Sequence, residues 1–150
     1  MDANKLKFDN VSFDLAFSRR GPTPFEEIYR ILKPEGYFIV IEIGEKDCID
    51  IKKVFGRGQS YGKWNKSKLK EIQSEVKKIG FDVIFSKDYI YNEYYKSYED
   101  LDLFLQGVPI FEDFNSEKDS VFLKKYADKF KTEKGIKLPH HRVVFVFQKS

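Results

Sequence analysis

Two adjacent arginines, Arg19 and Arg20, offer the clearest binding chemistry in the sequence. They follow Ser18, directly after the segment 13–17, whose alternation of apolar and other residues is typical of a β-strand. Two guanidinium groups at the end of a strand are able to hold a carboxylate or a phosphate through bidentate hydrogen bonds. The alternative interpretation is a solvated loop with both arginines in water, and the residue pattern leaves both open.

Two carboxylates, Glu42 and Glu45, flank the end of the apolar run 37–41. Either one is able to accept a proton from a substrate hydroxyl or amine. The competing interpretation of Glu42 is structural, because it is the first polar residue as the run leaves the core. A carboxylate with no identified partner does not by itself indicate catalysis, so the structural interpretation is favoured.

The neighbouring residues His140 and His141 raise the question of a metal site, and the pattern argues against one. Adjacent residues on a strand point to opposite faces, and no cysteine or third histidine is close to them in the sequence. We therefore predict no metal site and assign His141 to the rim of a substrate site. The single cysteine, Cys48, cannot form an internal disulfide, which favours a reducing, cytoplasmic location.

The elements that position these residues begin with a strand, a helix and a second strand. After the strand at 13–17, Thr23 as cap, Pro24 at the first helical position and Glu26 in a capping box predict a helix start. The helix is expected to end before residues 33–36. The apolar run that follows suits a strand covered on both faces, as in a mostly parallel sheet. This order is an α/β crossover unit.

The rest of the chain continues the α/β pattern. Periodicity and capping residues predict four helices, at 49–55, at 67–79, from Ser97 and from Ser116. A strand is expected at 81–85, and residues 88–95 either continue it or form an aromatic loop. The last apolar run, 142–147, shows no alternation, so we expect it to be a central strand.

Residues 13–44 carry a resemblance to a known family. The opening Phe13-Asp14-Leu15-Ala16 and the later Arg30-Ile31-Leu32-Lys33-Pro34-Glu35-Gly36 resemble the motifs at the fourth and fifth strands of class I S-adenosylmethionine-dependent methyltransferases. The family commonly has Phe-Asp-Leu-Val at the first place and Arg-Val-Leu-Lys-Pro-Gly-Gly at the second. Here Glu35 stands in place of the first glycine. Since the later elements also fit the family's order, the resemblance covers nearly the whole chain.

The resemblance implies an α/β, partial Rossmann-like methyltransferase fold. The expected mixed sheet has about four strands in the order fourth, fifth, seventh, sixth, with the last strand of the chain inserted antiparallel and helices packed on the sheet. S-adenosylmethionine is the implied cofactor of the complete domain, with Asp2-Ala3 beside its adenine. The implied cofactor-binding residues are Asp2, Ala3, Ser18 and Arg19, and the implied substrate-binding residues are Arg20, Glu42, Glu45 and His141.

The glycine-rich turn of this family, Asp/Glu-x-Gly-x-Gly after the first strand, is not found in the sequence. Glycine is needed there because a side chain would collide with the cofactor. The segment Gly56-Arg57-Gly58 does not follow a convincing strand, so it is no substitute. We therefore expect residues 1–150 to form a single C-terminal domain that lacks the cofactor-binding half. Alone, it is expected to bind S-adenosylmethionine poorly and to be inactive.

The composition limits the partners. The chain carries 27 Lys+Arg against 24 Asp+Glu, a net charge of +3, which does not favour nucleic acid. The sequence has neither a signal-peptide pattern nor an apolar run long enough to cross a membrane. A small-molecule substrate is the default expectation.

A second hypothesis belongs to a different class of function. Without the first three strands of the family, the strand at 13–17 would lie at an exposed sheet edge, and such an edge tends to find a partner. Two copies pairing through it would build a symmetric dimer, or a separate polypeptide would supply the missing half. In this case the chain is a cofactor-free interaction domain.

Overall fold

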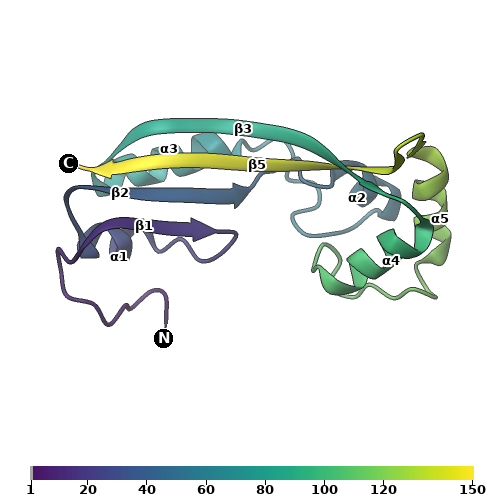
Figure 1. Cartoon of the computed structure of the whole chain (residues 1–150), viewed down its shortest axis with the longest axis horizontal. Coiled ribbons are helices and arrows are strands. Elements are labelled where there is room, and N and C mark those ends of the chain that lie inside the picture. The colour runs from purple at the N-terminus through teal and green to yellow at the C-terminus, as the bar shows by residue number, and fades with distance from the viewer. Residues whose placement is uncertain (1) are drawn as a thin grey trace. The chain divides into compact units, whose positions relative to one another are not determined.

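The computed structural model describes residues 2–150, which form five helices and five strands (Figure 1). The helices are α1 (Phe25–Ile31), α2 (Ile49–Phe55), α3 (Lys68–Ile79), α4 (Tyr98–Gly107) and α5 (Ser120–Lys129). The strands are β1 (Phe13–Arg19), β2 (Leu32–Ile43), β3 (Phe81–Tyr95), β4 (Lys131–Thr132) and β5 (Gly135–Lys149). Residues 88–95 therefore continue the strand that begins at Phe81.

The sheet has the strand order β1-β2-β5-β3, and the short β4 pairs with β5. Strand β1 runs parallel to β2, and β5 runs antiparallel to β2. The long last strand therefore lies between its neighbours, as Figure 1 shows. The order and directions expected from the family resemblance, fourth, fifth, seventh and sixth, are confirmed.

The described residues fall into two compact units. One contains the chain up to Gly44, together with Lys66–Tyr89 and Arg142–Ser150, and the other contains Glu45–Asn65 and Ile90–His141. Strands β3 and β5 contribute residues to both. The expectation of a single domain over residues 1–150 stays a prediction.

The core of the first unit lies between the sheet and helices α1 and α3. Phe25 of α1 and Val76 of α3 pack against a buried sheet face that includes Phe38, Val40 and Phe145. Helix α3 lies within the predicted range 67–79: the side chain of Ser67 accepts a hydrogen bond from the backbone N–H of Lys70, and Gly80 ends the helix at φ 116°. The capping box predicted for α1 is wrong, because α1 starts after Pro24 without a side-chain cap.

The opposite face of this sheet is largely uncovered, which corrects the expectation for the run 37–41. Phe38 and Val40 are fully buried, but Tyr37 on the other face is 41% exposed. Tyr37 pairs with Leu15 of β1, and Leu15 and Phe17 are 54% and 60% exposed. Both helices of the unit pack on the Phe38 face. The apolar run therefore predicted the strand correctly, but it did not predict that helices pack on only one of its faces.

The turn before the main part of β2 has an unusual backbone. Phe13 pairs with Leu32 and Leu15 pairs with Tyr37, so the register shifts across residues 33–36. Glu35 has a φ of 65°, in the left-handed region that favours glycine. The next residue, Gly36, leaves no room for a side chain, since a Cβ there would lie 2.8 Å from the carbonyl oxygen of Lys33. Glu35 occupies the place where the family pattern has its first glycine.

The second unit packs α2, α4 and α5 around an apolar core (Figure 1). Cys48, Leu101, Leu123 and Leu138 are fully buried in it. The predicted start of the last helix at Ser116 is wrong, because α5 begins at Ser120. The Ser116 hydroxyl donates instead to the Asp102 carboxylate.

Candidate functional site

The loop after β1 lies beside the carboxyl end of β2. The backbone N–H of Arg20 donates to the carbonyl oxygen of Ile41 over 2.8 Å, and the hydroxyl of Ser18 donates to the carbonyl oxygen of Pro22 over 3.2 Å. Arg20 has a φ of 52°, another left-handed residue. These bonds fix the loop at the edge of the sheet where open α/β sheets bind ligands.

The side chains predicted here divide between the two faces of the sheet. Ser18 pairs with Val40, so it shares the helix-covered face, and Glu42 shares that face by the strand's two-residue alternation. Arg19 faces the opposite, open side. Partial burial raises the pKa of Glu42, while the nearby charge of Lys68 lowers it by a smaller amount. Glu42 is thus the carboxylate of this region best suited to take up a proton.

The N-terminal segment that carries Asp2 and Ala3 is held against α1 by an ion pair. Glu27 and Arg30 form this pair at 2.9 Å, and Glu27 also accepts from the backbone N–H of Leu6. Arg30 donates to the backbone oxygen of Leu6 as well. The hydrogen bond from Arg30 lowers the pKa of Glu27 to about 2. Sequence reasoning missed this pair, although its i,i+3 spacing on a predicted helix was a usable signal.

Glu45 and His141 belong to the second unit, where they lie together. The Nδ1 atom of His141 is 3.8 Å from Oε2 of Glu45 and accepts a hydrogen bond from the backbone N–H of Lys46 over 3.1 Å. Nδ1 of His141 therefore carries no proton in this arrangement, which places the ring proton on Nε2. The buried His141 side chain is fixed by its backbone neighbour, and its assignment to a substrate site stays a prediction.

No metal site was predicted because no cysteine lies near His140 and His141 in the sequence, but a cysteine does lie near His140 in the folded chain. The fold brings the single cysteine, Cys48, to within 3.7 Å of Nδ1 of His140, and Asp47 lies beside both. The interacting pair is separated by 92 residues in the sequence, so no local pattern could have revealed it.

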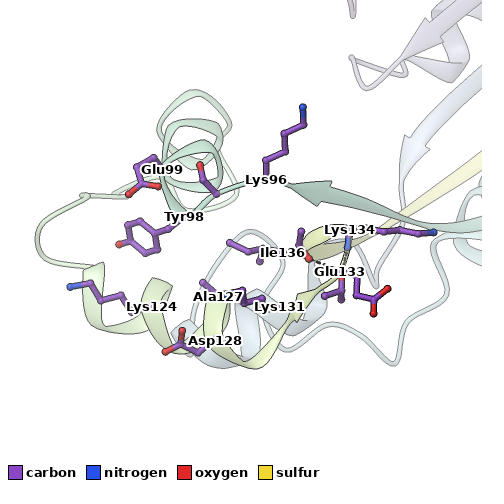
Figure 2. A pocket seen from close by; sticks show the side chains of 13 residues that line it. Lys96, Tyr98, Glu99, Lys124, Ala127, Asp128, Lys131, Glu133, Lys134 and Ile136 are labelled. Atoms are coloured by element: carbon purple, nitrogen blue, oxygen red, sulfur yellow. Dashed lines mark hydrogen bonds between the residues drawn. The ribbon is translucent and has the colours of Figure 1, made fainter.

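The second unit also contains an open pocket of about 760 Å³ (Figure 2). Its walls come from the start of α4, from α5 and from the β4–β5 turn. Charged residues of both signs line it, namely Lys96, Lys124, Lys131 and Lys134 with Glu99, Asp128 and Glu133. None of the site residues predicted from the sequence lies in this pocket. Its nearly balanced charge gives it no marked preference for an anion or a cation.

Solved structures with the same fold cover almost the whole chain. A candidate methyltransferase (BH2331) from Bacillus halodurans C-125 is 16% identical with a TM-score of 0.63. A functionally unknown protein from Deinococcus radiodurans R1 is 14% identical with a TM-score of 0.59, and the cyclase SpnF is 15% identical with a TM-score of 0.53. Each match covers 99% of the chain. The fold is therefore that of class I methyltransferases.

The chain spans only part of these proteins, namely 69%, 57% and 55% of their lengths in the same order. No protein-family model and no curated protein sequence matches the chain. Because SpnF is described as a cyclase, the shared fold does not decide the reaction. Among residues 2–150, no helix combines the length and the apolar character that a membrane crossing requires.

Proposed function

We propose that this chain is the C-terminal part of an S-adenosylmethionine-dependent methyltransferase domain whose complete form acts on a small molecule. The observation that carries the proposal is the sheet order β1-β2-β5-β3 with an antiparallel β5. The match to a candidate methyltransferase over 99% of the chain supports it. The weakly basic composition favours a small substrate over nucleic acid.

The described residues supply only part of a site for the methyl donor. Gly56 and Gly58 have positive φ angles, but Gly56 ends helix α2 and does not follow a strand. The glycine turn that would let the backbone approach the cofactor is therefore missing from these residues. For the complete domain, we propose Asp2, Ala3, Ser18 and Arg19 as cofactor contacts and Arg20, Glu42, Glu45 and His141 as substrate contacts.

A titration with S-adenosylmethionine tests this function. The chain is joined, ahead of Asp2, to the segment of its reading frame or of a neighbouring frame that encodes a Gly-x-Gly turn. We expect micromolar binding, and we expect Ser18→Ala to weaken it by about 2- to 10-fold, the range of one lost hydrogen bond. Asp128→Ala, in the separate pocket, is the matched control. Absence of binding by the joined chain would refute the methyltransferase assignment.

A second candidate function is favoured by the exposed side chains of β1. Strand β1 stands at the end of the sheet order, and its residues Leu15 and Phe17 are more than half exposed. We propose that two copies of the chain pair through this edge when nothing else covers it. Antiparallel pairing centred on Ala16 would set Leu15 of one copy opposite Phe17 of the other, twice. Apolar cross-strand pairs of this kind stabilise a sheet.

The charges of β1 allow the same pairing. Asp14 of one copy would lie opposite Ser18 of the other, so no like charges face each other in this register. The two-fold symmetry makes the interface self-complementary. The alternative is that a separate polypeptide pairs with the same edge of β1. Dissociation of the dimer when the joined segment is present would support this alternative.

A further inference from the structure

We propose that Asp47, Cys48 and His140 form a zinc-binding site in the second unit. None of the three residues is among those assigned to methyl transfer, although His140 precedes His141 and Asp47 follows Glu45 by two positions. The inference does not depend on that function. One atom from each residue, a carboxylate oxygen, the thiol sulfur and an imidazole nitrogen, lies within 4.8 Å of the others. Thiolate, imidazole and carboxylate are the ligand types that bind Zn²⁺ in proteins.

The distances between the side-chain atoms are close to those around a tetrahedral zinc ion. Sγ of Cys48 lies 3.7 Å from Nδ1 of His140 and 3.6 Å from Oδ2 of Asp47, while the other carboxylate oxygen, Oδ1, lies 3.1 Å from Nδ1. With Zn–S near 2.3 Å and Zn–N near 2.0–2.1 Å, a tetrahedron has ligand-to-ligand edges of about 3.3–3.6 Å. Binding of the ion would therefore require the Asp47 carboxylate to turn so that one of its oxygens faces both Sγ and Nδ1. The fourth position is left for water or another small ligand.

The charge balance also suits a divalent cation. The three side chains are almost completely buried, with 6% of Asp47, none of Cys48 and 3% of His140 exposed. A buried thiolate and a buried carboxylate together carry two negative charges, which are costly unless they are compensated. The two positive charges of Zn²⁺ would balance the thiolate and the carboxylate, and with a neutral imidazole the occupied site would carry no net charge.

The surroundings of His140 resemble those of a metal ligand. Its second nitrogen, Nε2, lies 3.0 Å from Oε2 of Glu93, and the hydroxyl of Tyr95 donates to the same Glu93 oxygen. A carboxylate on the far nitrogen fixes the ring and raises the basicity of the metal-binding nitrogen. The ring of Tyr91 stacks on His140 with centroids 5.4 Å apart. The imidazole is therefore held with Nδ1 toward Cys48.

The backbone around Cys48 is equally constrained. Cys48 has a φ of 51°, in the left-handed region, and its N–H donates to the carbonyl oxygen of Pro139 over 3.0 Å. The backbone N–H of His141 donates to Oδ1 of Asp47 over 2.9 Å. A strained backbone that persists because its surroundings fix it is a common feature of functional sites.

Lys52 is the competing counter-charge for the same cluster. It is only 4% exposed, and its pKa is lowered by burial and partly restored by the charges of Cys48 and Asp47. If Lys52 is the permanent partner of these groups, the cluster is a closed ion-pair network with no role for a metal. Lys52→Met separates the two arrangements. If the cluster is an ion-pair network, this variant should lower the free energy of unfolding. If the cluster is a zinc site, the variant should leave the zinc affinity unchanged or increase it.

The test is a titration of the whole reduced chain with Co²⁺, which replaces zinc and is visible by absorption. Because the chain has a single cysteine, a thiolate-to-cobalt charge-transfer band can arise only from Cys48. We expect this band to saturate at one equivalent together with tetrahedral d–d bands, and Zn²⁺ to displace both. No thiolate band in the folded wild-type chain at one equivalent would overturn the proposal.

Variants assign the remaining ligands. Asp47→Asn and His140→Gln should each abolish stoichiometric binding, and Glu93→Gln should weaken it by about 10- to 100-fold, the usual effect of losing an outer carboxylate. Asp119→Asn is the matched control for Asp47→Asn, since both aspartates are 6% exposed and Asp119 pairs with Arg57 instead of with the cluster. Circular dichroism checks the fold of each variant. Unchanged binding in a folded His140→Gln chain would contradict the assignment, as would loss of zinc affinity in a folded Lys52→Met chain.

Discussion

Replacing the exposed apolar side chains of β1 by threonine should prevent self-association and leave the fold intact. Leu15 and Phe17 are 54% and 60% exposed, so the double variant Leu15→Thr, Phe17→Thr removes only the smaller part of each side chain that packs within the chain. Threonine keeps a strong preference for strands. We therefore expect the free energy of unfolding of the monomer to fall by about 1–2 kcal/mol, less than the stability of a typical folded domain.

The effect on association follows from the same exposed fractions. Complete burial of a leucine or phenylalanine side chain contributes about 1.5–3 kcal/mol. With slightly more than half of each side chain still exposed, burial of that exposed part at the edge would contribute about 2–3 kcal/mol from the two side chains of one copy. Their loss should raise the dissociation constant of the dimer by roughly 30-fold or more.

Sedimentation velocity over a range of concentrations measures this dissociation constant. Leu103→Gln with Val121→Gln is the matched control, since these residues are 67% and 71% exposed and belong to α4 and α5 of the other compact unit. The control should dimerise like the wild-type chain. A wild-type chain that stays monomeric at high concentration, or a threonine variant that dimerises equally well, would show that the chains do not pair through β1.

Two further predictions concern stability. Glu35→Gly should raise the melting temperature by roughly 1–4 °C. It relieves about 1–2 kcal/mol of left-handed backbone strain at φ 65°, and the greater chain entropy of glycine cancels roughly half of this gain. Calorimetry showing an unchanged or lower melting temperature would contradict this prediction. Glu42→Gln should stabilise the chain at pH 7 and not at pH 4. The raised pKa of Glu42 means that the folded state favours the protonated form, so stability is present below the unfolded pKa and falls as the pH rises through the folded pKa. Urea unfolding at both pH values measures the difference, and an equal gain at pH 4 and pH 7 would show that burial of the charge is not the cause.

Much of the fold could be predicted because local signals agree with it. The Phe-Asp-Leu opening and the Leu-Lys-Pro-x-Gly turn placed β1 and β2, and the unalternating run 142–147 predicted a central strand, which β5 confirms. The cap at Ser97 was predicted from the capping residues there, and its side chain accepts a hydrogen bond from the backbone N–H of Asp100.

The failures have physical causes. The capping box at Thr23 is not used, because Pro24 sets the start of α1. The apolar run 37–41 could not predict that one face of its strand is exposed, because the burial of each face depends on where helices from other parts of the chain pack.

The candidate sites could be predicted only where the residues are neighbours in sequence. The loop after β1 was found because its residues are contiguous. The contacts of His140 with Asp47 and Cys48 join residues 93 and 92 positions apart, so only the folded chain reveals them. The Glu27–Arg30 pair could have been predicted from its spacing in the sequence. That it holds the N-terminal segment is known only from its hydrogen bonds to the backbone of Leu6.

The most direct test of the central claim is a calorimetric titration with S-adenosylmethionine, run in parallel on the 150-residue chain and on the chain joined to a segment that supplies the first three strands. We expect no micromolar binding to the chain alone and one bound cofactor per joined chain. Micromolar binding to the chain alone would show that its own residues form a complete cofactor site. No binding to either form would contradict the methyltransferase assignment.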